Sequence, residues 1–384
     1  MKMFLTECLE FVGTTVQEFE GEKRYISTGA LDKDHVNEAD VELVTYENRP
    51  SRANLQAVAG DILFAKMANT EKTFMVDSIS AEDIYSTGFC AVRANDKKIL
   101  RKCLFYFLSS SLFLEQKDKN SSGATQKAIT NSGLAQITIT LPSLEEQQKF
   151  VGQMDLLNDA ITAQTRQLAM LDDLVKARFV EMFGDPVKNE MQWQTKSLEE
   201  ACRIIVDCPH STPNYTNEDT GFMCIRTSIV KKNRILWDEI EYICEDEYNK
   251  RIQRKRPEKG DVVYTREGAI LGIAAVIDRD CNVALGQRSM LLSPDTEQCT
   301  PEFLSVAMNC DTFLDNALKG QSGSASPHIN VGDIKAFKMI MPPVEQQRQF
   351  SAFIKQADKS KLAVQQSLEK LVTLKKSLMQ RYFG

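Results

Sequence analysis

The sequence contains no apolar run that approaches the roughly 20 residues of a bilayer-spanning helix, and its first residues lack the apolar core of a secretion signal. We therefore expect a cytoplasmic protein. None of its 10 cysteines forms a Cys-x-x-Cys pair, which gives a zinc site or a disulfide framework little support. Most of these thiols are expected to be buried apolar groups. The three histidines have no two-histidine metal spacing, so metal and triad chemistry are poorly supplied.

Motifs of several enzyme classes are missing as well. The chain has no Gly-x-x-x-x-Gly-Lys-Ser/Thr loop for nucleotide phosphates. Segment 268–272 is too short for a dinucleotide fingerprint and predicts a turn between strands. Segment 341–344, Met-Pro-Pro-Val, lacks the polar first residue and the aromatic residue of the amino-methyltransferase motif. Because several classes fail together, we predict a chain without catalytic residues or catalytic activity of its own.

What the sequence does contain is a direct repeat with a period of about 200 residues. Gly-Asp-Ile-Leu-Phe-Ala-Lys at 60–66 recurs as Gly-Asp-Val-Val-Tyr-Thr-Arg at 260–266, and the Phe-Gly pair at 183–184 recurs at 383–384. This period is far above the 20–50 residues of solenoid repeats. Each copy is therefore expected to be a complete domain with an appendage.

The first part of each copy is expected to be mixed α/β. Short runs rich in β-branched and aromatic residues predict strands at 61–65, 89–93, 137–141, 261–265, 273–277 and 337–341. One helix is predicted at 99–115 and its counterpart at 301–318, where Pro301 suits the first helical turn.

The second part of each copy has the pattern of a long amphipathic helix. After Pro142 and after Pro342, apolar residues recur at alternating spacings of four and three, which is the spacing of a coiled coil. The predicted seam consists of Phe150, Met154, Leu157, Ile161, Leu168, Leu171 and Val175, and of Phe350, Ile354, Val364, Leu368, Leu371 and Leu378. Each stripe needs a partner, and the other helix is the candidate within the chain. Pairing with its own globular domain or with another protein is the alternative.

We expect the two helices to pair antiparallel, which would turn the direct repeat into an object with pseudo-two-fold symmetry. A helix of about 38 residues would be roughly 57 Å long. The predicted fold class is α+β, with two mixed α/β domains separated by an antiparallel coiled-coil pair. The predicted boundaries are 1–143 for the first domain, 144–184 for the central helix, 185–343 for the second domain and 344–384 for the C-terminal helix.

Basic residues cluster locally, although the net charge is −6 and the isoelectric point is near 5.4. Lys66 and Arg266 each follow an apolar strand at the same place in both copies. A cation there could contact a DNA base, a phosphate or a structural carboxylate. A second group consists of Arg226, Lys231, Lys232 and Arg234. The alternative for any one cluster is a solvated face. The net charge of the whole chain does not decide between this alternative and a DNA contact, because charges can be segregated on the surface.

Two polar loops, 121–127 and 321–328, also recur at one position of the repeat. Their glycines give backbone freedom, and their hydroxyls and amides suit phosphates or base edges. Lys127 and His328 are the candidate contacts, and a flexible turn is the alternative. Copies that share a frame but differ in loop content would suit the recognition of two different half-sites.

The order of these segments resembles the specificity subunit of type I restriction–modification systems. Leu-Pro-x-Leu-Glu-Glu-Gln-Gln at 141–148 opens a heptad helix that Met-Phe-Gly-Asp closes at 182–185. The second copy has Met-Pro-Pro-Val-Glu-Gln-Gln at 341–347 and ends in Tyr-Phe-Gly. Segment 193–198 looks like the opening of a target recognition domain, whereas the first copy lacks its tryptophan.

This resemblance implies two target recognition domains that each recognise one half of a bipartite, asymmetric DNA site, with a spacer set by the helix pair. It implies docking of two methyltransferase subunits, which bind S-adenosylmethionine and methylate adenine N6, and of restriction subunits that use ATP and Mg²⁺. No cofactor or metal is expected in this chain. The alternatives are a specificity subunit of another restriction class or of a methylation-only system, and an adhesive scaffold that does not bind DNA.

Overall fold

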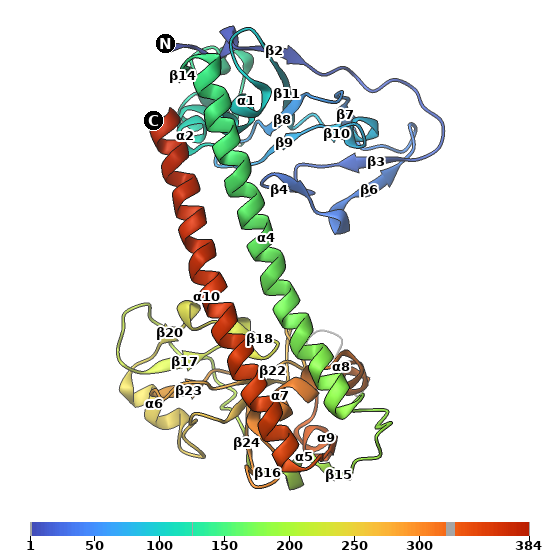
Figure 1. Cartoon of the computed structure of the whole chain (residues 1–384), viewed down its shortest axis with the longest axis vertical. Coiled ribbons are helices and arrows are strands. Elements are labelled where there is room, and N and C mark those ends of the chain that lie inside the picture. Colours follow the sequence, from blue (N-terminus) through green and yellow to red (C-terminus); the bar gives the residue numbers. More distant parts are fainter. Residues whose placement is uncertain (1, 125, 320–326, 384) are drawn as a thin grey trace. The chain divides into compact units, whose positions relative to one another are not determined.

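The computed structural model of the chain describes residues 2–124, 126–319 and 327–383 (Figure 1). The chain divides into two compact units, unit 1 (Met1–Thr165 with Gln366–Gly384) and unit 2 (Arg166–Gln365). Each unit therefore contains one globular part and a segment of both long helices.

The globular part of unit 1 is built on two four-stranded sheets. One has the antiparallel order β2 (Leu9–Val12), β11 (Phe89–Ala94), β8 (Ile62–Ala65) and β9 (Thr73–Met75). The other has the order β6 (Glu42–Val44), β3 (Lys23–Ile26), β10 (Ile84–Ser86) and β7 (Ala53–Leu55), in which β3 and β10 are parallel. Smaller elements are β1 (Lys2–Phe4) with β14 (Thr138–Thr140), β4 (Leu31–Asp32) with β5 (His35–Val36), β12 (Ser121–Ser122) with β13 (Ala128–Ile129), and helices α1 (Arg101–Leu108), α2 (Ser111–Lys119) and α3 (Asn131–Leu134).

Unit 2 repeats this arrangement, except that its second sheet has three strands in place of four among the described residues. Its antiparallel sheet has the order β16 (Cys202–Asp207), β24 (Ser289–Pro294), β21 (Val262–Thr265) and β22 (Ala274–Val276). The second sheet has the order β20 (Glu241–Tyr242), β17 (Met223–Ile225) and β23 (Val283–Leu285), again with one parallel pair. Smaller elements are β15 (Thr195–Ser197) with β25 (Lys338–Ile340), β18 (Val230–Lys231) with β19 (Arg234–Ile235), and helices α5 (Leu198–Ala201), α6 (Glu245–Arg251), α7 (Pro301–Asn309), α8 (Asp311–Leu318) and α9 (Val331–Ala336). The internal repeat and the α+β class predicted from the sequence are confirmed.

Strands β8 and β21 each lie between two hydrophobic cores, which explains their unbroken apolar sequences. In β8, Phe64 packs into the core that contains α1, whereas Leu63 packs into the core beside β10. In β21, Tyr264 and Val263 divide between two cores in the same way. Since successive side chains of a strand point to opposite faces, a strand buried on both faces has no polar alternation.

The single helices predicted at 99–115 and 301–318 are wrong, because each is broken into two. In unit 1, Ser110 has extended backbone angles (φ −89°, ψ 153°), and its Oγ accepts a hydrogen bond from Phe113 N at 3.2 Å. This is the N-cap of a new helix. In unit 2, Cys310 has extended angles (φ −60°, ψ 137°) at the corresponding break. A buried apolar stripe runs through both helices of each pair, which is why periodicity alone merges them.

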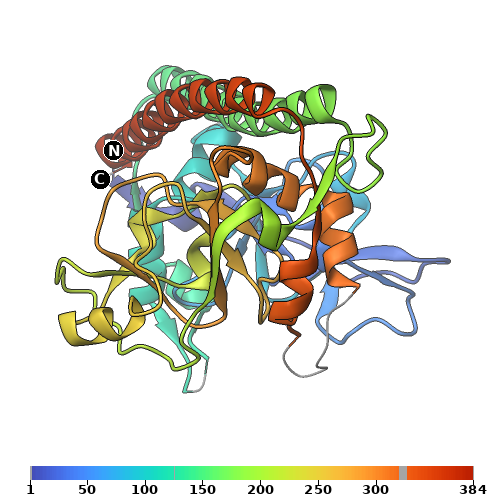
Figure 2. The same ribbon diagram turned by 90° about the horizontal axis from the view of Figure 1, so that it is seen from below.

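The long helices are α4 (Leu144–Phe183) and α10 (Val344–Phe383). Each has 40 residues, which gives a length of about 60 Å. Figures 1 and 2 show α4 in green and α10 in red running side by side.

In unit 1, the beginning of α4 lies against the end of α10. The Phe150 ring stacks on that of Tyr382, with 3.8 Å between centroids. Further along, Gln164 Nε2 donates a hydrogen bond to Ser367 Oγ at 2.8 Å. As residue numbers rise along one helix, those of the contacted residues fall along the other, so the pair is antiparallel here.

In unit 2, the end of α4 lies against the beginning of α10. Asp172 and Lys361 form an ion pair at 2.7 Å, and the rings of Phe179 and Phe350 lie 5.6 Å apart. The order is again antiparallel. Among the described residues this is one direct ion pair between the two helices. Another acidic residue of α4, Asp155, pairs instead with Lys102 of α1 at 2.6 Å.

The positions predicted for the seam are buried or half-buried on both helices. Phe150, Met154, Val175 and Phe350 are buried, and half-buried positions are Leu157, Ile161, Leu168, Leu171, Ile354, Val364, Leu368, Leu371 and Leu378. The predicted stripe misses the end of α4, where Phe179 and Phe183 are fully buried in the core of unit 2. A spacing of four residues from Val175 onward is the signal that identifies them.

A buried glutamine joins each long helix to its own globular part. Gln147 Oε1 accepts from Leu100 N (2.9 Å), and its Nε2 donates to the carbonyl oxygens of Lys98 (2.9 Å) and Pro142 (3.2 Å). The amide therefore caps the start of α1 and the start of α4 at once, which satisfies main-chain groups at two helix ends.

Gln347 does the same in unit 2. Its Oε1 accepts from Thr300 N (2.9 Å), and its Nε2 donates to the carbonyl oxygens of Gln298 (2.9 Å) and Pro342 (2.8 Å). Both side chains are 0% exposed. One glutamine of the Glu-Gln-Gln sequence at each helix start therefore has a structural role, the first in unit 1 (Gln147) and the second in unit 2 (Gln347). Sequence reasoning noted this sequence as a motif only.

Replacing Gln147 with methionine is expected to lower the free energy of unfolding by about 3 kcal/mol, since three main-chain groups lose the hydrogen bonds that this fully buried amide makes with them. Chemical denaturation measures this change. The matched control is Gln148→Met, because Gln148 is exposed on the next position of α4 and its substitution is expected to change stability by less than about 0.5 kcal/mol. Equal effects of the two substitutions on stability would contradict the role of Gln147 in joining α4 to the globular part of unit 1.

All 10 thiols are free, and seven of them are buried. Within the part of the chain that the structure describes, no helix is long and apolar enough to span a membrane.

Candidate nucleic-acid interface

In unit 1, the segment after β8 brings two predicted site residues together. Lys66 N donates to Gly88 O and Lys66 O accepts from Ile129 N, each at 2.9 Å. Ala68 N donates to Lys127 O at 2.9 Å. Lys66 and Lys127 thus lie on neighbouring antiparallel segments. The Lys66 side chain is half-buried and that of Lys127 is exposed.

Unit 2 has the same junction after β21. Arg266 N donates to Arg288 O at 3.0 Å, and Arg266 O accepts from Ile329 N at 2.9 Å. Glu267 forms a β-bridge with His328. The structure therefore places Arg266 beside His328 as it places Lys66 beside Lys127. We call these two places the strand-end junctions.

The Arg266 guanidinium is bound to a carboxylate, one of the three alternatives that its sequence position allowed. It is 6% exposed, and its Nε lies 2.9 Å from Asp207 Oδ1. His210 lies beside this pair, with Nε2 3.1 Å from Asp207 Oδ2 and Nδ1 3.4 Å from Arg266 Nη2. Neither Asp207 nor His210 was predicted, because they reach the junction from β16 and the loop after it.

Arg226 lies near loop 286–288 of unit 2, whose Arg288 accepts the hydrogen bond from Arg266 N. Its Nη1 is 3.0 Å from Glu241 Oε1, and its guanidinium lies 5.4 Å from the centroid of the Tyr215 ring. The adjoining residue, Ile225, accepts a hydrogen bond through its carbonyl from Gly286 N at 2.9 Å. Loop 286–288 therefore contacts the neighbourhoods of both Arg226 and Arg266.

Lys231 and Lys232 lie on the β18–β19 hairpin and have other partners. Lys231 Nζ donates to Ser228 O, and Lys232 Nζ pairs with Asp311 Oδ1 at the start of α8, each at 2.8 Å. The hydrogen bond and the charge of Lys232 lower the pKa of Asp311. The structure thus leaves this pair outside the strand-end junction of unit 2.

Arg288 is a basic residue that sequence reasoning missed. Its φ of +72° lies in the left-handed region, which is uncommon for residues other than glycine. Its side chain is partly exposed, with Nε 3.8 Å from Glu267 Oε1. The repeat offers the signal, since Arg288 occupies the position of Gly88, whose carbonyl receives Lys66 N in unit 1.

Most of the second polar loop, residues 321–326, and one residue of the first, Thr125, fall outside the described residues. Lys127 and His328, at the ends of these loops, are described. Among the described residues, no group of three or more His, Cys, Asp or Glu side chains is arranged to hold a metal ion.

Comparisons with known proteins agree with this geometry. The model of the type I restriction modification DNA specificity domain matches residues 8–170 and 190–374. The type I restriction enzyme MjaVIII specificity subunit of Methanocaldococcus jannaschii is 22% identical over 306 residues, which are 75% of this chain and 71% of that protein. The HindI specificity subunit of Haemophilus influenzae is 26% identical over 167 residues, which are 42% of this chain and 36% of that protein.

Two solved structures have a similar fold. The S subunit of a type I restriction-modification system from M. genitalium has a TM-score of 0.55 and 14% identity, and covers 100% of this chain and 96% of its own. A chain from a type I R-M system, solved to describe complex assembly and conformational transition, has a TM-score of 0.58 and 20% identity, with 100% and 97% covered. With a family model matched once in each half and over most of its length, the chain belongs to the type I restriction–modification DNA specificity family, as a specificity subunit with two recognition domains.

Proposed function

We propose that this chain directs adenine methylation and cleavage to a bipartite, asymmetric DNA site, and that each globular part recognises one half of it. The observation that carries the proposal is the repeated strand-end junction. In each unit, a segment leaving a doubly buried strand is hydrogen-bonded to the segment at 127–129 or 327–329, and basic side chains lie on both. A rigid strand end that presents side chains at fixed positions suits recognition of base edges and phosphates.

The contacts of the side chains suggest different roles for the predicted residues. Lys66, Lys127 and His328 are the proposed contacts at the junctions. Arg266, held by a carboxylate, is proposed to position its segment. Arg226 carries a single ion pair and a ring contact, and is proposed as a contact from the adjoining loop; Lys231 and Lys232 would contact phosphates from their hairpin.

The helices are proposed to dock two methyltransferase subunits, one for each unit, and with them the restriction subunits. Several large apolar side chains of α4 and α10 are exposed to between 36% and 72%. Those in unit 1 are Leu144, Leu156, Val372 and Leu374, and those in unit 2 are Met170, Leu174, Val180 and Leu362. Exposed apolar side chains gathered on one element are typical of protein–protein contacts. S-adenosylmethionine, ATP and Mg²⁺ would be bound by these partners, in the cytoplasm.

The decisive experiment maps methylated adenines in a genome that carries this chain together with its methyltransferase. We expect one bipartite sequence to be modified, and we expect modification to stop when the gene for this chain is deleted. Methyl transfer or cleavage by the purified chain alone would contradict its role as a specificity subunit, and modification that persists after deletion would contradict the proposal.

Replacing Lys66 and Lys127 with alanine is expected to weaken binding of the reconstituted complex to its site. Since each phosphate contact adds about 0.9 to the slope of log affinity against log salt, the slope should become shallower by roughly 2 if both contact phosphates. Lys149→Ala on α4 is the control, since the Lys149 side chain is 70% exposed and pairs with Glu145. A salt slope that the double substitution leaves unchanged would exclude both lysines as phosphate contacts.

A further inference from the structure

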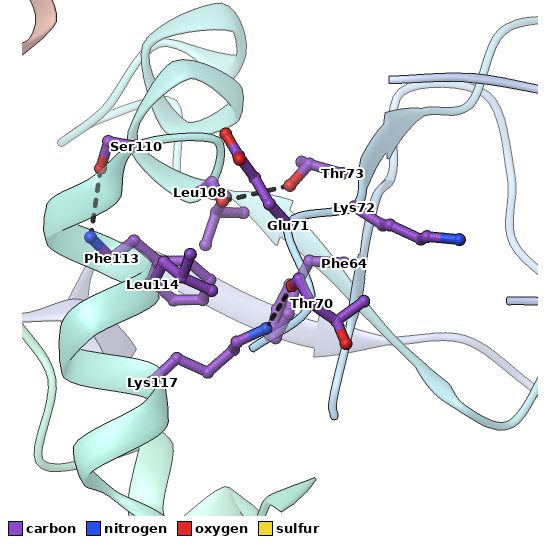
Figure 3. A pocket seen from close by; sticks show the side chains of 10 residues that line it. All are labelled: Phe64, Thr70, Glu71, Lys72, Thr73, Leu108, Ser110, Phe113, Leu114 and Lys117. Atoms are coloured by element: carbon purple, nitrogen blue, oxygen red, sulfur yellow. Dashed lines mark hydrogen bonds between the residues drawn. The ribbon is translucent and has the colours of Figure 1, made fainter. Parts of the chain in front are cut away.

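Lys117 is a lysine buried inside the globular part of unit 1. It lies on α2, is 1% exposed, and points from the helix toward the β8–β9 loop (Figure 3). Its ammonium donates hydrogen bonds to the carbonyl oxygens of Ala65 (3.1 Å), Met67 (2.9 Å) and Thr70 (2.6 Å). The three acceptors come from one short stretch, which consists of the last residue of β8 and the loop that follows it.

The contacts of this ammonium match its protonated form. An ammonium has three N–H donors and no acceptor, and here all three donors are used by carbonyl oxygens. A neutral amine would have two donors and would turn a lone pair toward a carbonyl oxygen. The adjoining cavity, lined in part by Thr70 and Thr73, has a volume of about 10 Å³, which is room for about one water molecule. The group therefore holds the loop and not a ligand.

The next residue of α2, Asp118, also binds this loop, but it accepts a hydrogen bond where Lys117 donates. Asp118 Oδ1 accepts a hydrogen bond from Asn69 N at 2.9 Å. Asn69 has a φ of +56°, so the loop turns sharply at this point. On its other side, the loop is bonded to Gly88 and to segment 127–129. Lys117 and Asp118 thus determine the inner face of a loop whose outer connections form the strand-end junction.

The second copy has no such lysine. The repeat places Ala317 at this position of α8, where it is 4% exposed within the core. The equivalent loop of unit 2 begins at Arg266, which Asp207 holds from β16. The two copies therefore fix the equivalent loop by different interactions. Unit 1 uses hydrogen bonds from the Lys117 ammonium to carbonyl oxygens, and unit 2 uses the ion pair between Arg266 and Asp207.

We propose that Lys117, assisted by Asp118, is a positioning residue that fixes the loop of unit 1 carrying Lys66 and thereby determines sequence discrimination in one half-site. The inference rests on the proposed function for its DNA readout, whereas the ordering of the loop can be measured without DNA. Because unit 2 has alanine at this position, the other half-site is an internal control.

Because Lys117 is charged, its effect on the order of the loop should depend on pH. Burial lowers the pKa of Lys117 to about 8, and the Asp118 carboxylate opposes the shift. The other charged groups on the elements packed against it are Lys66, Glu71 and Lys72 on the loop and Lys127 beside it. The ammonium is therefore mostly protonated at pH 7 and mostly neutral at pH 9. Because the folded-state pKa lies below the unfolded value, the contribution of this group to global stability rises with pH between about 8 and 10.5. Loss of loop order on deprotonation is thus distinct from unfolding.

The test compares Lys117→Met with Lys119→Met, since Lys119 is exposed on the same helix. In the reconstituted complex, Lys117→Met should reduce discrimination against base changes at least tenfold in one half-site and leave the other half-site unchanged. The wild type should lose the same discrimination between pH 7 and pH 9, the variant should show a flat profile, and Lys119→Met should behave as the wild type.

Hydrogen exchange without DNA separates this inference from the proposed function. Lys117→Met should raise exchange at the amides of Ala68 and Asn69 at least tenfold, and the wild type should show the same excess exchange on going from pH 7 to pH 9 after correction for intrinsic rates. If hydrogen exchange rises in Lys117→Met but the complex binds no DNA, the proposed function is contradicted and the role of Lys117 in ordering the loop is supported. Unchanged exchange at both pH values, or discrimination lost equally in both half-sites, would overturn the inference; if the variant does not fold, the pH series on the wild type decides.

Discussion

Replacing Phe350 with alanine is expected to destabilise unit 2 by about 3 to 5 kcal/mol, the usual cost of removing a fully buried phenylalanine. Its ring is 0% exposed and contacts those of Phe179 at 5.6 Å and Phe183 at 5.4 Å. The loss includes the transfer of the side chain to water and the cavity left between the helices. For a unit of this size, Tm should fall by roughly 10 °C.

The control for this substitution lies on the same helix. Leu362 is 55% exposed on α10, so Leu362→Ala is expected to change the free energy of unfolding by less than about 0.5 kcal/mol. Calorimetry measures both variants, and hydrogen exchange shows which amides lose protection. Amides of unit 2 should do so in Phe350→Ala. Similar stabilities of the two variants would mean that the helix contact contributes little to the fold.

Deleting one heptad from both long helices is expected to change the spacer of the DNA site and leave both half-sites intact. Residues 162–168 of α4 and 364–370 of α10 lie opposite each other in the antiparallel order, as the Gln164–Ser367 contact indicates. Seven residues of helix are about 10.5 Å long, which corresponds to roughly three base pairs of duplex. The methylated site should have a spacer shorter by this number.

The control deletes residues 162–168 alone. This change leaves the second helix at its full length and moves the seam out of register, so the variant is expected to lose stability and all site-specific methylation. Genome-wide mapping of methylated adenines measures both variants. An unchanged spacer in the double deletion, or altered half-site sequences, would contradict the expectation that the helix pair sets the spacer.

Much of the fold could be predicted because it depends on local patterns. The stripe from Phe150 to Val175 has a spacing that only a helix can place on one face, and the repeat makes each copy evidence for the other. The predicted seam misses Phe179, because the spacing of apolar residues changes there. The break at Ser110 was missed because its cap is a single hydrogen bond inside a continuous apolar stripe.

The candidate site was harder to predict because its partners are distant in sequence. Arg266 was identified by its place after a strand, but its carboxylate comes from Asp207 on another strand. Lys117 gives no signal in sequence, since a lysine on a helix is usually solvated and its carbonyl partners belong to the backbone. Pairing between distant strands determines both contacts, and local spacing does not contain this information.

The joints made by Gln147 and Gln347 have a consequence for how such chains diversify. All six hydrogen bonds of the two amides go to main-chain atoms, so the joint does not depend on which side chains surround it. A recognition domain with a different sequence can make the same three bonds provided that its backbone follows the same path. Genetic exchange of either domain would therefore produce a new sequence preference on an unchanged helical support.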